Sequence, residues 1–378
     1  MRILLLCKRQ YTGKDLLDDH YGRLFEFPRI LSQRGHQVAG LSVSYRRRRQ
    51  GDFSWEEYPH LSWRSLNLVS SRLPWLPASI MRYARSFGPD LVIASSDAWH
   101  LGMGSWVASR IGVPLVVDLY DNYESFGLSR LPGARALIRN ACRAAVGVAT
   151  VSRRLADLVV TEYGCQNAVR VVGNGVDTRI FHGRDKEHCR RALSLPATGF
   201  LIGTAGALTA GRGVGDLQNA FLRVAQERSD AWLVLAGRRD GSLRPLRHPR
   251  LIDLGELPHE EVGLLLSSLD VGVVCNRDTP FGRYCFPLKL HEMMAAGTPV
   301  VAASVGDVSE VLADTPESLY QPGDAGDLAD KLVHLAAEPE RAAANSSRSW
   351  EAMADELEAW LISLLELANG SMPSAGEE

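Results

Sequence analysis

The sequence predicts an α/β protein with two domains, each built around a parallel β-sheet. First, a chain of 378 residues is too long for a single domain with one hydrophobic core, and its length fits two domains. Second, short apolar runs alternate along the chain with amphipathic helical segments, which is the pattern of βαβ units. Third, a hydrophobic content of 46% and a charged content of 23% are those of a soluble globular protein.

The first residues predict a βαβ opening. Residues 1–7 form a buried strand, residues 22–35 a helix with one apolar face, and residues 37–43 the next strand. The first strand is not followed by G-x-G-x-x-G, so the sequence does not support a dinucleotide-binding dehydrogenase.

Two further strands, residues 89–94 and 113–118, bring polar side chains to one edge of the first sheet. In open α/β sheets, ligands bind at the carboxyl ends of the strands. We therefore expect a substrate site here, although a lone histidine is often structural. The polar residues that follow these strands are Asp97, His100, Tyr120 and Asp121.

The second half opens with the strand 200–205, followed by the glycine-rich run GALTAGRGVGDL. Arg212 and Gly213 close this loop just before a helix, an arrangement that holds a diphosphate. The alternative is an arginine in water. Arg238 follows the next predicted strand, and Leu257 lies in a later loop where it could pack on a nucleotide base.

Residues 281–310 carry the clearest pattern of the chain, predicted as a loop, a helix and a buried strand. Pro287 suits the first turn of the helix, and Gly297 ends it. Lys289 and Glu292 lie three residues apart on one helical face, at a helix start that attracts phosphate. A surface ion pair of small energetic value is the alternative.

The run PLKLHEMMAAGTPVVAAS at 287–304 resembles the signature of the retaining glycosyltransferases of family 4. VVGNGVDTRIF at 171–181 is similar to the motif at the junction of that family's two domains. The resemblance implies the GT-B fold, two Rossmann-like domains facing each other across a cleft. It also implies that a sugar passes from a UDP- or GDP-linked donor to an acceptor hydroxyl, in glycan, polysaccharide or glycolipid synthesis. No metal or other cofactor is expected.

The resemblance also suggests roles for individual residues. Glu292 would bind the ribose of the donor, and Arg212 and Lys289 would stabilise its diphosphate. The expected donor-binding residues are Gly206, Arg212, Gly213, Arg238, Leu257, Leu288, Lys289 and Glu292. The expected catalytic residues, acting mainly by positioning, are Asp121 and His100, and those on the acceptor side are Lys14, Asp97 and Tyr120.

Four positions depart from the family pattern. Tyr284 stands where the family often has a second glutamate, and Pro287 stands where it usually has a glycine. Ala207 replaces an expected cation, and Tyr120 replaces an expected histidine. These departures keep two other functions open. One is a non-catalytic sugar- or nucleotide-binding partner subunit, and the other is a nucleotide-sugar epimerase on the same fold.

The resemblance divides the chain into an acceptor-binding domain at 1–183 and a nucleotide-sugar-binding domain at 184–349. A helix at 350–368 is expected to cross back to the first domain. Residues 369–378 are polar and small, which predicts a disordered tail.

Charge and cysteine content exclude several partners. A net charge of −2 gives no electrostatic case for nucleic acid. Six scattered cysteines without a CxxC pair indicate a reducing compartment and no zinc site. The longest apolar runs fall short of the roughly 18 residues of a membrane-spanning helix, which predicts a cytoplasmic protein.

Two basic segments predict contact with the inner face of the plasma membrane. One is the run of arginines at 46–49, and the other is LPWLPASIMRYARSF at 73–87, which mixes aromatic, aliphatic and arginine side chains. This is the composition of a helix lying on an anionic membrane. The alternative is an ordinary helix that covers the sheet and leaves its arginines in water.

Overall fold

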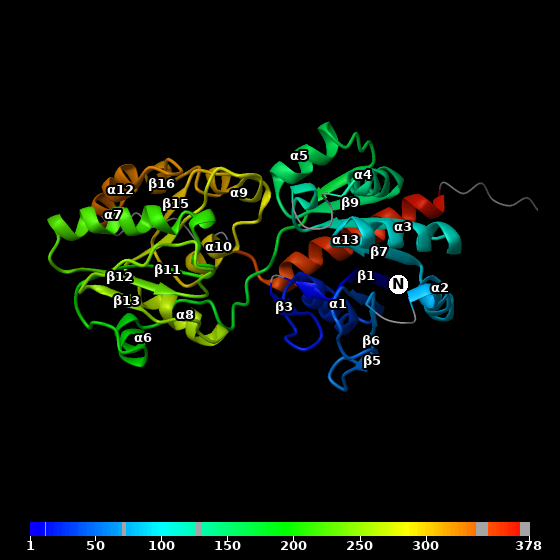
Figure 1. The fold of residues 1–378 in the computed structure, drawn as a ribbon. Helices are drawn as coiled ribbons and strands as arrows, with labels where there is room; N and C mark the ends of the chain where they lie inside the picture. Colours follow the sequence, from blue (N-terminus) through cyan, green and yellow to red (C-terminus); the bar gives the residue numbers. More distant parts are fainter. Residues whose placement is uncertain (12, 70–72, 126–130, 338–346, 371–378) are drawn as a thin grey trace, which may run out of the picture. The chain divides into compact units, whose positions relative to one another are not determined.

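The computed structural model divides into two α/β units (Figure 1). The first unit comprises Met1–Gly175, Tyr284–Phe286 and Trp350–Glu378, and the second comprises Val176–Arg283 and Pro287–Ser349. The structure describes residues 1–11, 13–69, 73–125, 131–337 and 347–370. Most of the predicted disordered tail, residues 371–378, therefore lies outside the described residues.

The first unit is built on an eight-stranded sheet in the order β10-β9-β8-β7-β1-β4-β6-β5. Its pairs are parallel except β5 with β6. The strands are β1 (Arg2–Lys8), β4 (Gln37–Ser44), β5 (Gly51–Ser54), β6 (Leu61–Asn67), β7 (Leu91–Ser95), β8 (Leu115–Leu119), β9 (Gly147–Thr150) and β10 (Ala168–Val171). A two-stranded hairpin, β2 (Gln10–Tyr11) with β3 (Lys14–Asp15), follows β1.

Helices cover both faces of this sheet, because both faces carry apolar side chains. One apolar core includes residues of α2 (Leu76–Phe87), α3 (Ala98–Ile111), α4 (Ala134–Ala144) and α5 (Arg153–Thr161). The core on the other face includes residues of α1 (Arg23–Gln33) and α13 (Trp350–Gly370). A 3₁₀ turn, η1 (Leu73–Trp75), precedes α2, and another, η2 (Tyr123–Ser125), follows β8.

The C-terminal helix α13 packs beside α1 in the first unit, although the whole second unit separates them in sequence. Leu357, Trp360 and Leu364 are buried there. A side-chain carbon at Gly147 would come within 2.6 Å of Leu364, so this helix needs a glycine in β9. None of the helices among the described residues is long and apolar enough to cross a membrane.

The second unit has a six-stranded parallel sheet in the order β13-β12-β11-β14-β15-β16. Its strands are β11 (Phe200–Ala205), β12 (Ala231–Ala236), β13 (Leu251–Asp253), β14 (Val271–Val274), β15 (Val300–Ala303) and β16 (Leu319–Tyr320). One face packs on α7 (Val214–Glu227) and α12 (Ala325–Ala337), the other on α8 (His259–Ser268) and α10 (Leu288–Ala295). Its shorter helices include α6 (Lys186–Ala192), η4 (Ala210–Arg212), α11 (Val308–Val311) and η5 (Pro316–Ser318).

Each sheet has a switch point where the strand order reverses. In the first unit β1 lies between β4 and β7, and in the second β11 lies between β12 and β14. Successive connections leave these central strands toward opposite edges, which opens a crevice at their carboxyl ends where ligands bind. The topology therefore marks the β1/β7 and β11/β14 ends as the places to look for sites.

Some local expectations differ from the structure. Residues 281–284, expected as loop, lie in the short helix α9 (Pro280–Tyr284), because Pro280 suits a first helical turn. The edge strand β5 and its neighbour β6 were not anticipated from the apolar pattern. β6 alternates buried and half-buried residues, as expected of a strand with only one face in the core, whereas a continuous apolar run marks a strand buried on both faces.

Candidate active site

At the switch point of the first unit, polar side chains from three strand ends gather around Asp97. Tyr45, just after β4, donates its hydroxyl to Asp97 Oδ1 at 2.9 Å. His100 Nδ1 lies 2.7 Å from the same oxygen, and Lys8 Nζ, at the end of β1, lies 4.0 Å from Oδ2. Asp97 is buried, while the Lys8 side chain is 28% exposed. Lys8 and Tyr45 were missed in the sequence because they follow strands that are adjacent only in the folded sheet.

His100 supports Asp97 from the interior. It is fully buried, and its second nitrogen, Nε2, lies 3.3 Å from the carbonyl oxygen of Val43. Burial would raise the pKa of Asp97, but the hydrogen bond and charge of His100 and the charge of Lys8 bring that pKa below its ordinary value. The carboxylate therefore stays ionised. The predicted catalytic role of His100 stays a prediction, and the geometry lets it act through Asp97.

Ser96 connects this cluster to Tyr120. Its backbone has a φ of 86°, which is strained for a residue with a side chain. Its hydroxyl accepts hydrogen bonds from the backbone N–H of Lys8 at 3.0 Å and from the Tyr120 hydroxyl at 3.3 Å. Asp121, next along the same edge, accepts the backbone N–H of Asn122 at 2.8 Å and is half-buried. The structure thus gathers Asp97, His100 and Tyr120, with Asp121 adjacent in sequence.

Lys14 lies apart from this cluster. It is exposed on the β2–β3 hairpin, and no interaction among the described residues joins it to Asp97. Its neighbour Asp15 pairs with Arg9, a fully buried arginine that also bonds Asp18. The carboxylates of this loop therefore neutralise Arg9, since a buried cation requires a partner.

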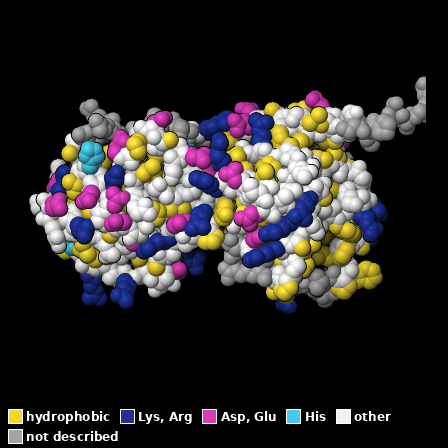
Figure 2. Space-filling view, turned by 90° about the horizontal axis from the view of Figure 1, so that it is seen from above, with side chains coloured by type: hydrophobic (Ala, Val, Ile, Leu, Met, Phe, Trp, Pro, Cys, Tyr) yellow, Lys and Arg dark blue, Asp and Glu magenta, His cyan; other side chains and the backbone are white. Residues whose placement is uncertain are grey.

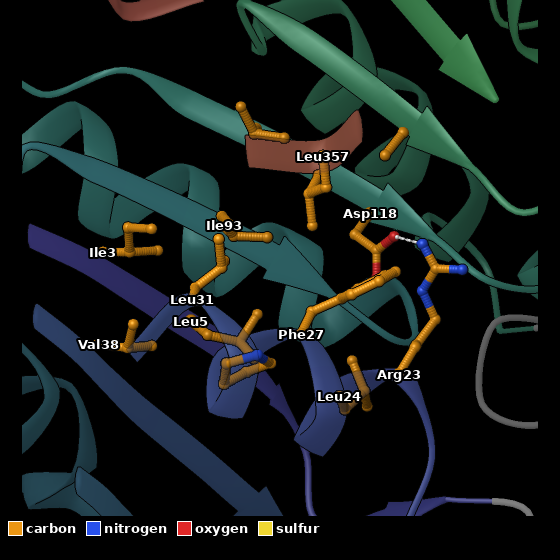
Figure 3. A pocket seen from close by; sticks show the side chains of 13 residues that line it. Ile3, Leu5, Arg23, Leu24, Phe27, Leu31, Val38, Ile93, Asp118 and Leu357 are labelled. Atoms are coloured by element: carbon orange, nitrogen blue, oxygen red, sulfur yellow. Dashed lines mark hydrogen bonds and ion pairs between the residues drawn. The ribbon is translucent and has the colours of Figure 1, made fainter. Parts of the chain in front are cut away.

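A second buried arginine, Arg23, connects the start of α1 to β8 and to the segment after β10. Arg23 Nη2 donates to Asp118 at 2.8 Å, and its Nη1 donates to the carbonyl of Val172 and to Asn174 Oδ1, both at 3.0 Å. Figure 3 shows the Arg23–Asp118 pair at one end of an otherwise apolar cavity of about 30 Å³. That volume suits about one water molecule. The cavity is a feature of the core and cannot hold a sugar.

The switch point of the second unit is built from glycine backbone and cations. Gly206, after β11, has a φ of 125°. A side-chain carbon there would lie 3.4 Å from Lys289 Cε, and one at Gly237 would lie 1.8 Å from the carbonyl oxygen of Gly206. Gly237 is thus required sterically, and Gly206 is required by its positive φ, which residues with a side chain rarely adopt. They leave open backbone beside Lys289, as a phosphate group would need.

Lys289 and Glu292 form an ion pair at the start of α10. Lys289 Nζ lies 2.7 Å from Glu292 Oε2. The Glu292 side chain is only 3% exposed and that of Lys289 is 35% exposed. This geometry departs from a surface ion pair, because a buried carboxylate depends on its partner. Leu288, one residue before, is half-buried against the core of the same face.

The remaining predicted donor residues lie around the same sheet edge. The Arg212 guanidinium carbon lies 3.8 Å from the centre of the Phe281 ring, a cation–π contact. Gly213, with a φ of 77°, is the N-cap residue of α7. Arg238 is largely exposed, with Glu256 3.9 Å away. Leu257 is half-buried beside the core.

Arg277 is a cation that sequence reasoning missed. It follows β14, at the switch point, and donates to Asp216 Oδ1 at 2.7 Å. A side-chain carbon at Gly213 would lie 3.7 Å from Arg277 Nε, so Arg277 borders the Arg212–Gly213 loop. The sequence could have indicated Arg277 through its position shortly after β14, the strand that neighbours β11. Across the described residues, no three His, Cys, Asp or Glu side chains lie close enough to hold a metal ion.

Comparisons with known proteins agree with this geometry. The model "Glycosyltransferase Family 4" matches residues 24–180, and "Glycosyl transferases group 1" matches residues 199–338. The chain is 26% identical to 2-deoxystreptamine glucosyltransferase of Streptomyces kanamyceticus, over 79% of this chain and 82% of that protein. It is 29% identical to D-inositol 3-phosphate glycosyltransferase of Acidothermus cellulolyticus, over 61% of this chain and 56% of that protein.

Solved structures share the fold. Sucrose-phosphate synthase from Thermosynechococcus elongatus superposes with a TM-score of 0.73 at 18% identity, covering 97% of this chain and all of that one. HepE of Anabaena, solved with UDP and glucose, gives a TM-score of 0.70 at 18% identity, covering 96% of this chain and all of that one.

Proposed function

Because this chain is a glycosyltransferase of family 4 with the GT-B fold, we propose that it moves a hexose from a UDP-linked donor to an acceptor hydroxyl with retained anomeric configuration. The general activity, transfer from a nucleotide sugar, follows from the family. The choice of UDP over GDP is supported by HepE, which was solved with UDP-glucose, and by a relative named as a glucosyltransferase. The acceptor would belong to glycan, polysaccharide or glycolipid synthesis.

The observation that carries the proposal is the buried Glu292 paired with Lys289 at the start of α10. A buried carboxylate can accept two ribose hydroxyls, while the half-exposed ammonium group faces the diphosphate. Departure of the diphosphate increases negative charge, which positioned cations stabilise. Lys289, Arg212 and Arg277 supply that charge from one sheet edge. Transfer would therefore need no metal ion, and activity should persist in EDTA.

The chemistry proposed for transfer is a direct exchange at the anomeric carbon. The bond from that carbon to the diphosphate oxygen breaks, and a bond to the acceptor oxygen forms on the same face. The acceptor proton moves to the departing phosphate oxygen. Asp97 and Tyr120 would position the acceptor hydroxyl, with His100 orienting Asp97 and Asp121 at the adjacent strand end.

We propose membrane contact through the limited apolar surface that the core leaves exposed at α2. Ile80, Met81 and Ala84 of α2 are buried in the core, so most of the apolar face of that helix is already used. Trp75, just before the helix, is 70% exposed, and Arg82 is exposed along it. An exposed tryptophan beside arginine suits a membrane interface. The protein would thus be cytoplasmic and peripheral on the inner face, and Trp75→Ser should weaken its co-sedimentation with anionic vesicles.

Thermal melting with a panel of UDP, GDP, ADP and their sugar conjugates tests the donor proposal. A ligand at a hundred times its dissociation constant stabilises a protein by about 2.7 kcal/mol, which raises the melting temperature measurably. We expect a shift with UDP compounds that is lost in Glu292→Ala. The matched control is Glu227→Ala, an exposed glutamate at the end of α7. Normal UDP affinity in Glu292→Ala would refute the central assignment.

A further inference from the structure

A run of four arginines lies at the edge of the first sheet that carries the Asp97 cluster. We define the arginine loop as Arg46, Arg47, Arg48 and Arg49, which follow β4 after Tyr45. All four are exposed. β4 is hydrogen-bonded to β1 in parallel, so the loop leaves the sheet beside Lys8. On the face drawn in Figure 2, Lys and Arg side chains lie close to Asp and Glu side chains in many places, in keeping with a net charge of −2.

The backbone of the arginine loop is fixed by three specific contacts. Ser44 Oγ donates to the carbonyl of Arg46 at 2.7 Å, and Asn67 Nδ2 donates to that of Arg48 at 2.7 Å. The buried Arg9 donates to the carbonyl of Arg49 at 2.6 Å. A loop held in this way presents its side chains from a rigid base, which lowers the entropic cost of binding a ligand.

The acidic groups nearby have hydrogen-bonding or charged partners of their own. Asp15 pairs with Arg9 and lies 3.4 Å from Arg48, and Asp97 accepts from Tyr45 and His100. Among the described residues, no carboxylate lies within 4.0 Å of the side-chain nitrogens of Arg46 or Arg47. Arg46 and Arg47 therefore present their positive charges to solvent.

We infer that the arginine loop, with Lys8, binds a phosphate group carried by the acceptor. The inference rests on the proposed function, which puts the acceptor hydroxyl beside Asp97 and Tyr120 at this same edge. Guanidinium groups bind phosphate through paired hydrogen bonds, and exposed arginines without carboxylate partners are available for it. The phosphate could belong to a water-soluble phosphorylated acceptor or to a lipid-linked one, and both offer the loop the same group.

The test is a calorimetric titration of UDP-saturated protein with inorganic phosphate, since UDP occupies the donor site. We compare wild type with the double variant R46Q/R47Q. The control is R110Q/R170Q, which removes two exposed arginines of the same unit, at the end of α3 and in β10. We expect phosphate affinity to fall at least tenfold in R46Q/R47Q and to be unchanged in R110Q/R170Q, with UDP melting shifts equal in all three proteins.

Co-sedimentation with phosphatidylcholine vesicles containing phosphatidylglycerol identifies the source of the phosphate. Reduced vesicle binding in R46Q/R47Q, together with the phosphate result, supports a lipid-linked acceptor, and unchanged vesicle binding supports a soluble one. Three results overturn the inference. They are absent phosphate binding, an equal loss of phosphate affinity in both double variants, and reduced vesicle binding in R46Q/R47Q with unchanged phosphate affinity. A wild-type protein without a UDP shift refutes the donor proposal instead, and phosphate titration without UDP still tests the loop.

Discussion

The two units share a doubly wound plan and yet fill their switch points in opposite ways. At the β1/β7 end of the first unit, side chains bond one another: Asp97 accepts from Tyr45 and His100. At the β11/β14 end of the second, glycines open the backbone and Lys289 stands half-exposed beside Gly206. One topology thus supports a closed polar network and an open edge, and the proposed function uses the first for the acceptor hydroxyl and the second for the donor diphosphate.

This difference fits the ligand that the proposed function gives to each unit. An acceptor hydroxyl is neutral and small, so a few rigid hydrogen-bonding groups must hold it. A nucleotide diphosphate is large and charged, so the chain has to leave room and provide cations. Three predictions test whether the two units really divide the work in this way.

The largest effect is expected from Arg23→Ala, which breaks the network of the first unit. The change leaves Asp118 buried without its cation and removes two bonds to Val172 and Asn174. Loss of one member of a buried ion pair costs about 3–5 kcal/mol. Urea denaturation should show it, with UDP binding by the folded protein retained. Arg64→Ala, which removes an exposed pair with Asp52, is the control and should cost less than about 1 kcal/mol.

A smaller effect is expected from Arg212→Ala in the second unit, and it should appear in binding. A hydrogen bond to a charged group contributes about 1.5–3 kcal/mol, so UDP affinity should fall at least tenfold. Uridine lacks the diphosphate, and its affinity should be unchanged. Calorimetry with both ligands separates the two results. Arg228→Ala, at the far end of α7, is the control, and an equal loss for uridine would contradict a role in diphosphate binding.

The smallest effect concerns pH. Burial lowers the pKa of His291, in α10, from 6.5 to about 4, so the folded second unit keeps this ring neutral. The unfolded chain takes up a proton near pH 6.5, so stability present above that pH is lost as the pH falls toward 4. The expected loss near pH 5.5 is about 1 kcal/mol.

Asp97 in the first unit behaves differently at acid pH. The pKa of its carboxyl group is below 3.8 in the folded state, so its contribution is present above 3.8 and is lost only at more acid pH. Because Asp97 contributes no change in this range, the melting temperature should decline from pH 7 to pH 4 through His291 rather than through Asp97. His291→Gln should flatten that decline. An unchanged slope in the variant would assign the effect to another group.

Sequence reasoning located much of the fold and named some of the residues that the structure brings together at each sheet edge. Strands buried on both faces, such as β1, β11 and β15, stand out as apolar runs, while β6, which has only one face in the core, does not. Lys289 and Glu292 were identified because the two residues pair with each other and lie only three positions apart in one helix. Tyr45 and Asp97 meet at 2.9 Å across 52 residues of sequence, and no local pattern shows that contact.

The sequence by itself determined the fold class, the alternation of elements and the donor motif, because apolar periodicity, helix caps and short-range spacing are local properties. Only the tertiary structure decided the burial of Glu292, the enclosure of His100 and the place of the arginine loop beside Lys8. Those features depend on which strands become neighbours. Strand order in a parallel sheet is set by the packing of helices on both faces, which involves the whole chain at once.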